Sequence, residues 1–238
     1  MIEAHSLTKN YPQRVAVQDL SFCIKPGEVF CLFGANGAGK TTTLNMFLNF
    51  AIPSAGQALI GGIDANRQPL LAKQQLAFLS ENVRLYHNFS AYQNVQFFAG
   101  LAMGQRISKA SCQNALSRCG LEPEFHHQRL GSFSKGMRQK TGLAICLVRQ
   151  ARAIFLDEPL SGLDPTAAAQ VLKVIRQLSD DGAAVFMATH DLWQTQRMAD
   201  QCAVMTAGRL KLHLCKSQLQ QLEQQQLLQL YQESVCES

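Results

Sequence analysis

The strongest constraint on this chain is a glycine-rich segment that ends in a lysine and a threonine and follows a short apolar run. Residues 34–41 read Gly-Ala-Asn-Gly-Ala-Gly-Lys-Thr, which fits the phosphate-binding loop pattern Gly-x4-Gly-Lys-Ser/Thr. Glycine permits backbone conformations closed to other residues, so successive N–H groups can turn inward around phosphate oxygens. The pattern predicts a strand at 29–33, this loop, and then a helix whose N-terminus faces the bound anion.

The residues of this loop have separate expected roles. Lys40 is expected to meet the β- and γ-phosphates of a nucleotide, and the Thr41 hydroxyl is expected to bind Mg²⁺. The simple alternative is a flexible glycine-rich turn, which needs neither the strand before it nor the helix after it. The predicted nucleotide-binding residues of this segment are Gly34, Asn36, Gly37, Gly39, Lys40, Thr41 and Thr42.

Four short apolar runs predict buried parallel strands, because each is nearly continuous in apolar residues and ends in polar ones. In open parallel sheets, ligands bind beyond the carboxyl ends of the strands. We therefore expect the residues that follow these strands to share one site. The runs are 29–33, 76–79, 153–156 and 184–188, followed by Gly34, Glu81, Asp157-Glu158 and His190.

The acidic pair at the end of the third run predicts a hydrolytic site. Asp157 is expected to bind the metal, and Glu158 to orient or deprotonate the attacking water. His190 is expected to contact the γ-phosphate or that water. The simpler alternatives are that the two acids cap a loop before Pro159 and that His190 is an ordinary buried histidine.

The remaining segments indicate three further parts. Residues 2–24, with a short strand at 58–60, suggest antiparallel strands, and 82–150 has helical spacing with a helix at 135–149. Val95, Phe98, Ala99 and Ala102 fall on one face of that insert. We predict one domain over 1–214 and an amphipathic helical tail over 215–238, which either packs on its own domain or contacts a partner.

Composition excludes several classes of protein. With 47% hydrophobic and 16% charged residues the chain is a packed globular protein, and its eight cysteines suit small buried hydrophobes. The net charge of +5 is unclustered, so we expect no nucleic-acid partner. The apolar runs are shorter than a membrane span, and the first residues lack the pattern of a secretory signal, so we expect a cytoplasmic protein.

In its motifs and their order, the chain resembles the nucleotide-binding subunits of ATP-binding cassette (ABC) transporters from about Leu7 to Leu210. Each motif of that family has a counterpart here. These are Tyr11 for adenine stacking, 34–42 for Walker A, Ser80-Glu81 for the Q-loop, 133–139 for the signature, 154–158 for Walker B, 161–164 for the D-loop and Thr189-His190 for the switch histidine.

Two positions depart from the usual family pattern. Glu81 stands where glutamine is usual, and the signature begins Phe-Ser-Lys-Gly-Met in place of Leu-Ser-Gly-Gly-Gln, keeping Ser134 and Gly136. Both variants resemble the branch whose ATPases pair with export-type permeases. Because a carboxylate at Glu81 is placed to approach Mg²⁺, it joins Thr41 and Asp157 as a predicted metal ligand.

The resemblance implies a P-loop NTPase core with a mainly parallel sheet, an N-terminal antiparallel β subdomain and a helical insert that bears the signature. It also implies ATP hydrolysis by Lys40, Glu158 and His190. Two copies, or two related subunits, are expected to meet head to tail, with Ser134, a plausible helix N-cap, and Gly136 facing the partner's ATP.

A membrane permease is the expected partner, which would hold the protein on the cytoplasmic face of the membrane. The insert and segment 81–98 are the candidates for its docking surface. The equal alternative is that the aromatic residues there, with Leu85, Tyr86, Phe89 and Phe97, fill the insert's own core. The alternatives for function are an ABC-type ATPase not coupled to transport and a nucleotide-binding regulator that does not hydrolyse ATP.

Overall fold

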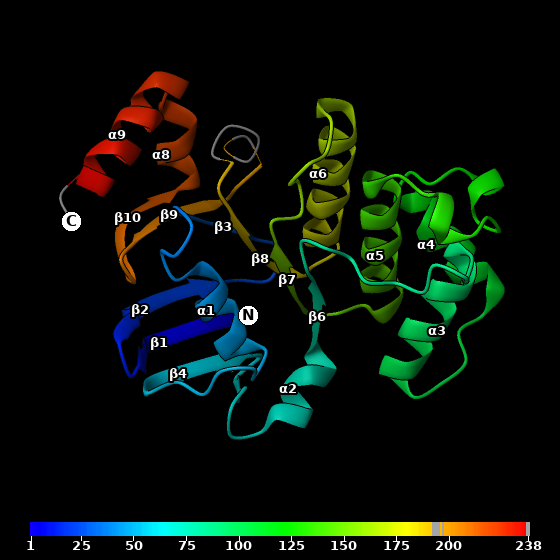
Figure 1. Ribbon diagram of the computed structural model, residues 1–238, viewed down its shortest axis with the longest axis horizontal. Helices are drawn as coiled ribbons and strands as arrows, with labels where there is room; N and C mark the ends of the chain where they lie inside the picture. The colour runs from blue at the N-terminus through cyan, green and yellow to red at the C-terminus, as the bar shows by residue number, and fades with distance from the viewer. Residues whose placement is uncertain (192–195, 197, 237–238) are drawn as a thin grey trace.

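The buried apolar segments form a six-stranded sheet at the centre of the computed structural model, which describes residues 1–191, 196 and 198–236 (Figure 1). The four predicted parallel strands are adjacent in it, and the mixed α/β fold is confirmed. The strands, in spatial order, are β10 (Arg209–Cys215), β9 (Gln201–Thr206), β3 (Val29–Phe33), β8 (Ala184–Thr189), β7 (Ala153–Asp157) and β6 (Leu76–Leu79).

The register of these strands brings their carboxyl ends to one edge. Phe33 of β3 lies opposite Thr189 of β8, and Ala188 lies opposite Asp157 of β7. Leu79 of β6 lies opposite Leu156. Because all four strands run parallel, the segments that follow them begin side by side, as the sequence predicts.

The hairpin of β9 and β10 was not predicted. In β10 the apolar residues Leu210, Leu212 and Leu214 alternate with Lys211 and His213, which is a signal for a strand with one solvent-facing side. The turn between the strands places Ala207 and Gly208 at φ of 47° and 82°, the left-handed values that a tight two-residue hairpin turn requires.

A four-stranded antiparallel sheet packs beside the central sheet, with α1 (Lys40–Phe47) between them (Figure 1). Aromatic rings fill this layer: the rings of Phe22 and Phe30 stack at 4.8 Å, and Phe30 and Phe186 at 5.6 Å. This is the predicted N-terminal β subdomain. Its strands, in spatial order, are β2 (Arg14–Ile24), β1 (Ile2–Tyr11), β4 (Ala55–Ile60) and β5 (Ile63–Asp64).

The predicted helical insert lies at the other end of the molecule (Figure 1). Val95 and Ala99 of α3 are buried in its core, whereas Phe98 and Ala102 line a groove described below. The helix predicted at 135–149 has those bounds. The helices from α2 to α6 are α2 (Pro69–Gln75), α3 (Ala91–Met103), α4 (Lys109–Arg118), the 3-10 helices η1 (Pro123–Phe125) and η2 (Leu130–Ser132), α5 (Lys135–Arg149) and α6 (Pro165–Asp180).

The C-terminal tail packs on its own chain. It forms α8 (Lys216–Gln221) and α9 (Gln224–Cys236), which lie beside β9 and β10 (Figure 1). Leu219 and Leu227 are buried there, and the Gln196 amide donates to two carbonyl oxygens of the tail. Among the described residues, no helix combines the length and the apolar character needed to cross a membrane.

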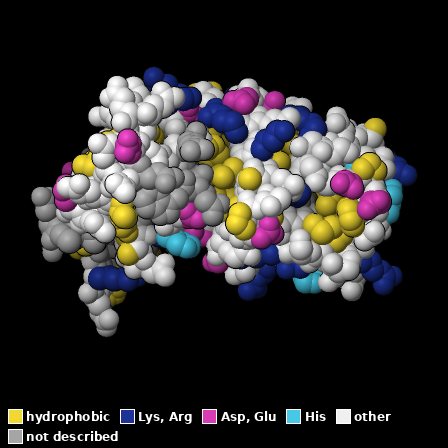
Figure 2. All heavy atoms as spheres, turned by 90° about the horizontal axis from the view of Figure 1, so that it is seen from above, with side chains coloured by type: hydrophobic (Ala, Val, Ile, Leu, Met, Phe, Trp, Pro, Cys, Tyr) yellow, Lys and Arg dark blue, Asp and Glu magenta, His cyan; other side chains and the backbone are white. Residues whose placement is uncertain are grey.

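Charges of both signs are mixed on the face drawn in Figure 2. Lys and Arg side chains lie between Asp and Glu side chains there, with small hydrophobic groups among them.

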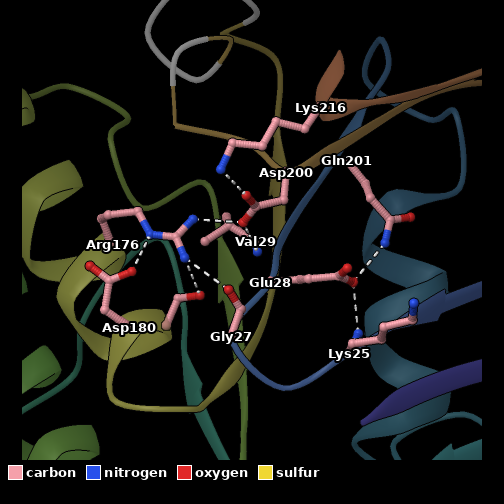
Figure 3. Close-up of polar contacts among 10 residues, drawn as sticks. Lys25, Gly27, Glu28, Val29, Arg176, Asp180, Asp200, Gln201 and Lys216 are labelled. Atoms are coloured by element: carbon pink, nitrogen blue, oxygen red, sulfur yellow. Dashed lines mark hydrogen bonds and ion pairs between the residues drawn. The ribbon is translucent and has the colours of Figure 1, made fainter. Parts of the chain in front are cut away.

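An ion network around the largely buried Asp200 connects the central sheet to α6 and to the tail (Figure 3). Asp200, the residue before β9, accepts hydrogen bonds from Val29 N (2.9 Å), Arg176 Nη1 (2.6 Å) and Lys216 Nζ (2.7 Å). Arg176 also donates to Gly27 O at 2.8 Å. One carboxylate thus connects β3, α6, β9 and α8.

Replacement of Asp200 by asparagine is expected to lower the free energy of unfolding by about 2 kcal/mol near pH 7, because two charge-assisted bonds to a largely buried carboxylate are weakened. Burial raises the pKa of Asp200, but hydrogen bonds from Lys216 and Arg176 outweigh it, so the pKa lies below the ordinary value. A depressed pKa stabilises the fold above the unfolded-state value of about 3.9, and this contribution is lost as the pH falls through the folded-state value.

Urea unfolding of both proteins between pH 3 and 8 measures this, and the difference between them is expected to shrink below about pH 4. Asp180→Asn is the matched control, because the exposed Asp180 pairs with the same arginine at 2.9 Å. Its effect is expected to be under about 0.5 kcal/mol. An equal loss in both variants would contradict the importance given to Asp200.

Candidate functional site

The glycine loop is shaped by contacts that exclude larger residues at two positions. A Cβ at Gly34 would collide with the Met205 carbonyl and lie 2.9 Å from the Cβ of Ala38. Gly39, at the N-terminus of α1, has φ of 116°, and a Cβ there would lie 2.5 Å from Ala16 O. These two positions therefore need glycine, and the start of α1 is directed at the loop they form.

Lys40 is the buried cation of the site. It is 6% exposed, its Nζ donates to Gly34 O at 2.5 Å, and it lies 3.9 Å from Glu158 Oε1. Burial lowers the pKa of Lys40, and the carboxylates of Glu158 and Asp157 oppose that shift. The ammonium thus lies between the glycine loop and the end of β7.

Asp157 and Glu158 lie together where β7 ends. Burial raises the pKa of Asp157, and the nearby Glu158 and Glu81 raise it further, while Lys40 lowers it. Glu158 has a φ of 48°, a left-handed conformation that costs a residue with a Cβ roughly 1–2 kcal/mol. Its N–H donates to Ala188 O of β8 at 2.9 Å, which holds it in place.

His190 contacts Glu158 from the end of β8. The distance between His190 Nδ1 and Glu158 Oε2 is 2.8 Å, and the His190 N–H donates to the same oxygen at 3.3 Å. Because a carboxylate only accepts, Nδ1 carries the proton in this bond. The His190 side chain is 61% exposed and that of Glu158 only 14%, so the buried histidine considered above is ruled out.

A cavity of about 250 Å³ joins most of the predicted site residues. Its wall is formed by the glycine loop, by Asp157 and Glu158 at the end of β7, and by Glu81, which follows β6. Its lining residues are Arg14, Ala16, Ala35, Asn36, Gly37, Gly39, Lys40, Thr41, Thr42, Glu81, Asp157 and Glu158.

The oxygen donors of this cavity suit Mg²⁺, which prefers carboxylate, hydroxyl and phosphate oxygens. Thr41, Asp157 and Glu81 all line it. Among the described residues no group of three or more His, Cys, Asp or Glu side chains could hold a metal by themselves.

At the β1–β2 hairpin, Arg14 lines the phosphate cavity and the predicted Tyr11 does not. Tyr11 is 39% exposed, and Lys9 Nζ lies 5.0 Å from the centre of its ring. Arg14 is the partner of Tyr11 across this hairpin. Arg14 was not predicted, because an isolated arginine in a strand carries no motif.

Ser134 and Gly136 lie outside this cavity, at the start of α5. Ser134 is the N-cap, as predicted, and its Oγ accepts from Met137 N at 3.2 Å. A Cβ at Gly136 would lie 3.2 Å from the Cβ of Ala167 in α6, so glycine permits close packing there. Within one chain these two residues do not meet the phosphate cavity.

Comparison with known proteins gives a consistent result. A sequence model of the family described as "ABC transporter" matches residues 17–161. The ABC transporter ATP-binding protein YxlF of Bacillus subtilis is 34% identical, over 100% of this chain and 77% of that protein. The bacitracin transport ATP-binding protein BcrA of Enterococcus faecalis is 31% identical, over 88% and 68%.

A solved structure has the same fold. It is the dimeric post-hydrolysis ATP-binding cassette MJ0796, bound to ADP and Pi, with a TM-score of 0.80. The sequences are 21% identical, and the match covers 91% of this chain and 99% of that one.

Proposed function

The chain belongs to the ABC transporter family and is an ATP-binding, ATP-hydrolysing cassette of it, and from this premise we propose that it powers a separate membrane permease that exports its substrate. The observation that carries the hydrolytic part is the convergence of Lys40, Asp157, Glu158 and His190 at one edge of the sheet. A protein that only binds ATP would not need a carboxylate such as Glu158 beside the phosphate site to activate water.

Each residue of the site has a role that its position supports. The loop N–H groups and Lys40 would bind the β- and γ-phosphates, and Thr41, Asp157 and Glu81, which line the same cavity, would hold Mg²⁺. The ion, when bound, neutralises charge on the phosphate oxygens. Glu158 takes a proton from the attacking water, and His190 fixes the Glu158 carboxylate through the 2.8 Å bond.

The adenine is assigned to the β1–β2 hairpin. Arg14 lines the cavity, and Tyr11 is its direct partner across the β1–β2 hairpin. We assign ring stacking to Tyr11 and a phosphate contact to Arg14. Stacking would require the Tyr11 ring to leave Lys9, whose cation–π contact is weak at an exposed position.

Two cassettes complete the sites by pairing head to tail. Ser134 is exposed at the N-terminus of a 15-residue helix, and the unpaired N–H groups of that turn attract an anion. In the pair it would face the γ-phosphate held by the other cassette, so ATP closes the pair and hydrolysis releases it. The MJ0796 cassette, which has the same fold, is dimeric in its post-hydrolysis state, and this supports the pairing.

A groove of about 410 Å³ is the proposed contact for the permease. It lies between β6 and the helical insert, and its lining is mostly apolar, with Leu85, Phe98, Leu101 and Ile145. The aromatic cluster next to it leaves Tyr86 and Phe97 partly exposed, at 49% and 41%. A short amphipathic helix of the permease fits such a groove and would hold the cassette at the cytoplasmic face of the membrane.

Export is favoured over import by two features. Glu81 and the Lys-Gly-Met signature, 135–137, resemble the exporter branch, and the name of BcrA describes bacitracin transport. The transported substrate is a property of the permease.

The experiment coexpresses this chain with a permease subunit from the same genome and measures how much of the chain sediments with membranes. Leu101→Glu is expected to reduce that fraction at least about tenfold, because a charge is placed in an apolar contact. Leu101 is 72% exposed, so the change should leave the fold intact.

Leu70→Glu is the matched control, since Leu70 is 78% exposed on α2 and does not line the groove. It is expected to sediment like the unmodified chain. Equal sedimentation of all three proteins, with or without the permease, would instead favour an ABC-type ATPase that is not coupled to transport.

A further inference from the structure

Glu81 has a hydrogen-bond partner that its predicted role as a metal ligand does not explain. Its Oε1 accepts from the hydroxyl of Ser161 at 2.8 Å, in a part-buried contact between positions 80 residues apart. Glu81 also lines the phosphate cavity, whereas Ser161 does not. The bond therefore connects the cavity to the D-loop segment 161–164. A carboxylate acceptor makes such a bond shorter and stronger than a neutral one.

Ser161 is the last residue of the turn that carries Glu158. The Ser161 N–H donates to Glu158 O at 3.2 Å, and Glu158 occupies its left-handed conformation at the first position of this turn. Such a backbone persists only where surrounding contacts fix it. The Glu81 bond is one of those contacts, because it holds the far end of the turn.

Gln139 of α5 contacts both the Glu81 segment and the turn 158–161. Its side chain is fully buried, and its Nε2 donates to Pro159 O at 3.1 Å and to Glu81 O at 3.5 Å. Its Oε1 has no hydrogen-bond partner among the described residues. One side chain thus contacts both segments that the Glu81–Ser161 bond joins.

We propose that Glu81 is a positioning residue for Glu158, which it acts on through Ser161 and the turn 158–161. Glu81 accepts the Ser161 hydroxyl, the turn is held, and the Glu158 carboxylate stays within reach of His190 and Lys40. The proposal rests on the role of Glu158 as the base that activates water. It adds a function to Glu81 beyond binding a metal ion.

A double-mutant cycle tests this with Glu81→Ala, Ser161→Ala and the double variant. At saturating Mg²⁺, kcat is expected to fall about tenfold in each single variant and no further in the double, with KM for ATP within about twofold. Ser161→Thr, which keeps the hydroxyl, is expected to retain kcat within about threefold. Ser132→Ala is the control, because it removes an exposed serine bond, 2.9 Å to Arg129 O, outside the site.

Hydrogen exchange of the nucleotide-free proteins gives a second readout. Exchange in residues 157–164 is expected to be at least about threefold faster in both alanine variants and unchanged in Ser132→Ala. The Glu81–Ser161 link would be overturned if the losses in kcat of the two single variants multiplied in the double variant. Unchanged hydrogen exchange in residues 157–164 would overturn it as well. A higher Mg²⁺ requirement in Glu81→Ala with normal turnover in Ser161→Ala would overturn it too. If hydrogen exchange became faster while kcat stayed unchanged, the turn would be loosened without an effect on hydrolysis. That result would refute the role of Glu158 as the base, on which the proposal rests.

Discussion

Replacement of Glu158 by glutamine is expected to lower kcat for ATP hydrolysis by about 10²–10³-fold, the usual contribution of a general base. Glutamine has the same shape, and its oxygen can still accept from Nδ1 of His190, so the site should remain assembled. The amide cannot take a proton from water. ATP should therefore bind and remain intact.

The trapped ATP state is measured by light scattering of Glu158→Gln with and without ATP. With ATP we expect a stable pair of cassettes, because hydrolysis no longer removes the γ-phosphate that joins them. Ser134→Arg added to this variant is expected to prevent the pairing without preventing ATP binding, since a large side chain would occupy the start of α5. Glu122→Gln, in an exposed loop, is the control for loss of one negative charge. Retained turnover in Glu158→Gln would refute its role as the base.

The site could be predicted where its residues follow apolar strands. In a parallel sheet the position of a residue just after a strand is fixed by the strand itself, so Gly34, Asp157, Glu158 and His190 could be brought together from sequence order. The predicted strand bounds were nearly right, because a short apolar run between polar residues is typical of a buried strand.

Contacts that depend on side chains from distant segments could not be predicted. No spacing in the sequence reports that Ser161 bonds Glu81 or that Arg14 reaches the phosphate cavity. The β9–β10 hairpin was missed for another reason. β10 is the edge strand, where one side faces solvent and the apolar run is interrupted. β9 has a short buried apolar run, Cys202–Met205, like those of the four predicted strands, and it was overlooked.

Replacement of Lys40 by alanine is expected to lower kcat/KM for ATP by about 10³-fold, because the buried ammonium is the one side-chain cation held between the loop and the acids of β7 in the described chain. Without it, Asp157, Glu158 and Glu81 would face the phosphates with no ammonium between them, and Arg14, which enters the cavity from the β1–β2 hairpin, would not replace that contact. Lys40→Arg should not restore activity, since the planar guanidinium does not fit where a compact ammonium is 6% exposed.

The fold is expected to survive this change. Burial already lowers the pKa of Lys40, so removing its charge also removes an unfavourable desolvation, which offsets the lost bond to Gly34 O. Thermal unfolding with and without ATP separates the two effects, because a ligand stabilises only to the extent that it binds. The melting temperature without ATP should stay within a few degrees, while the rise with ATP disappears. Lys173→Ala, on the exposed side of α6, should keep that rise. An ATP-induced rise that persisted in Lys40→Ala would place the triphosphate elsewhere in the molecule.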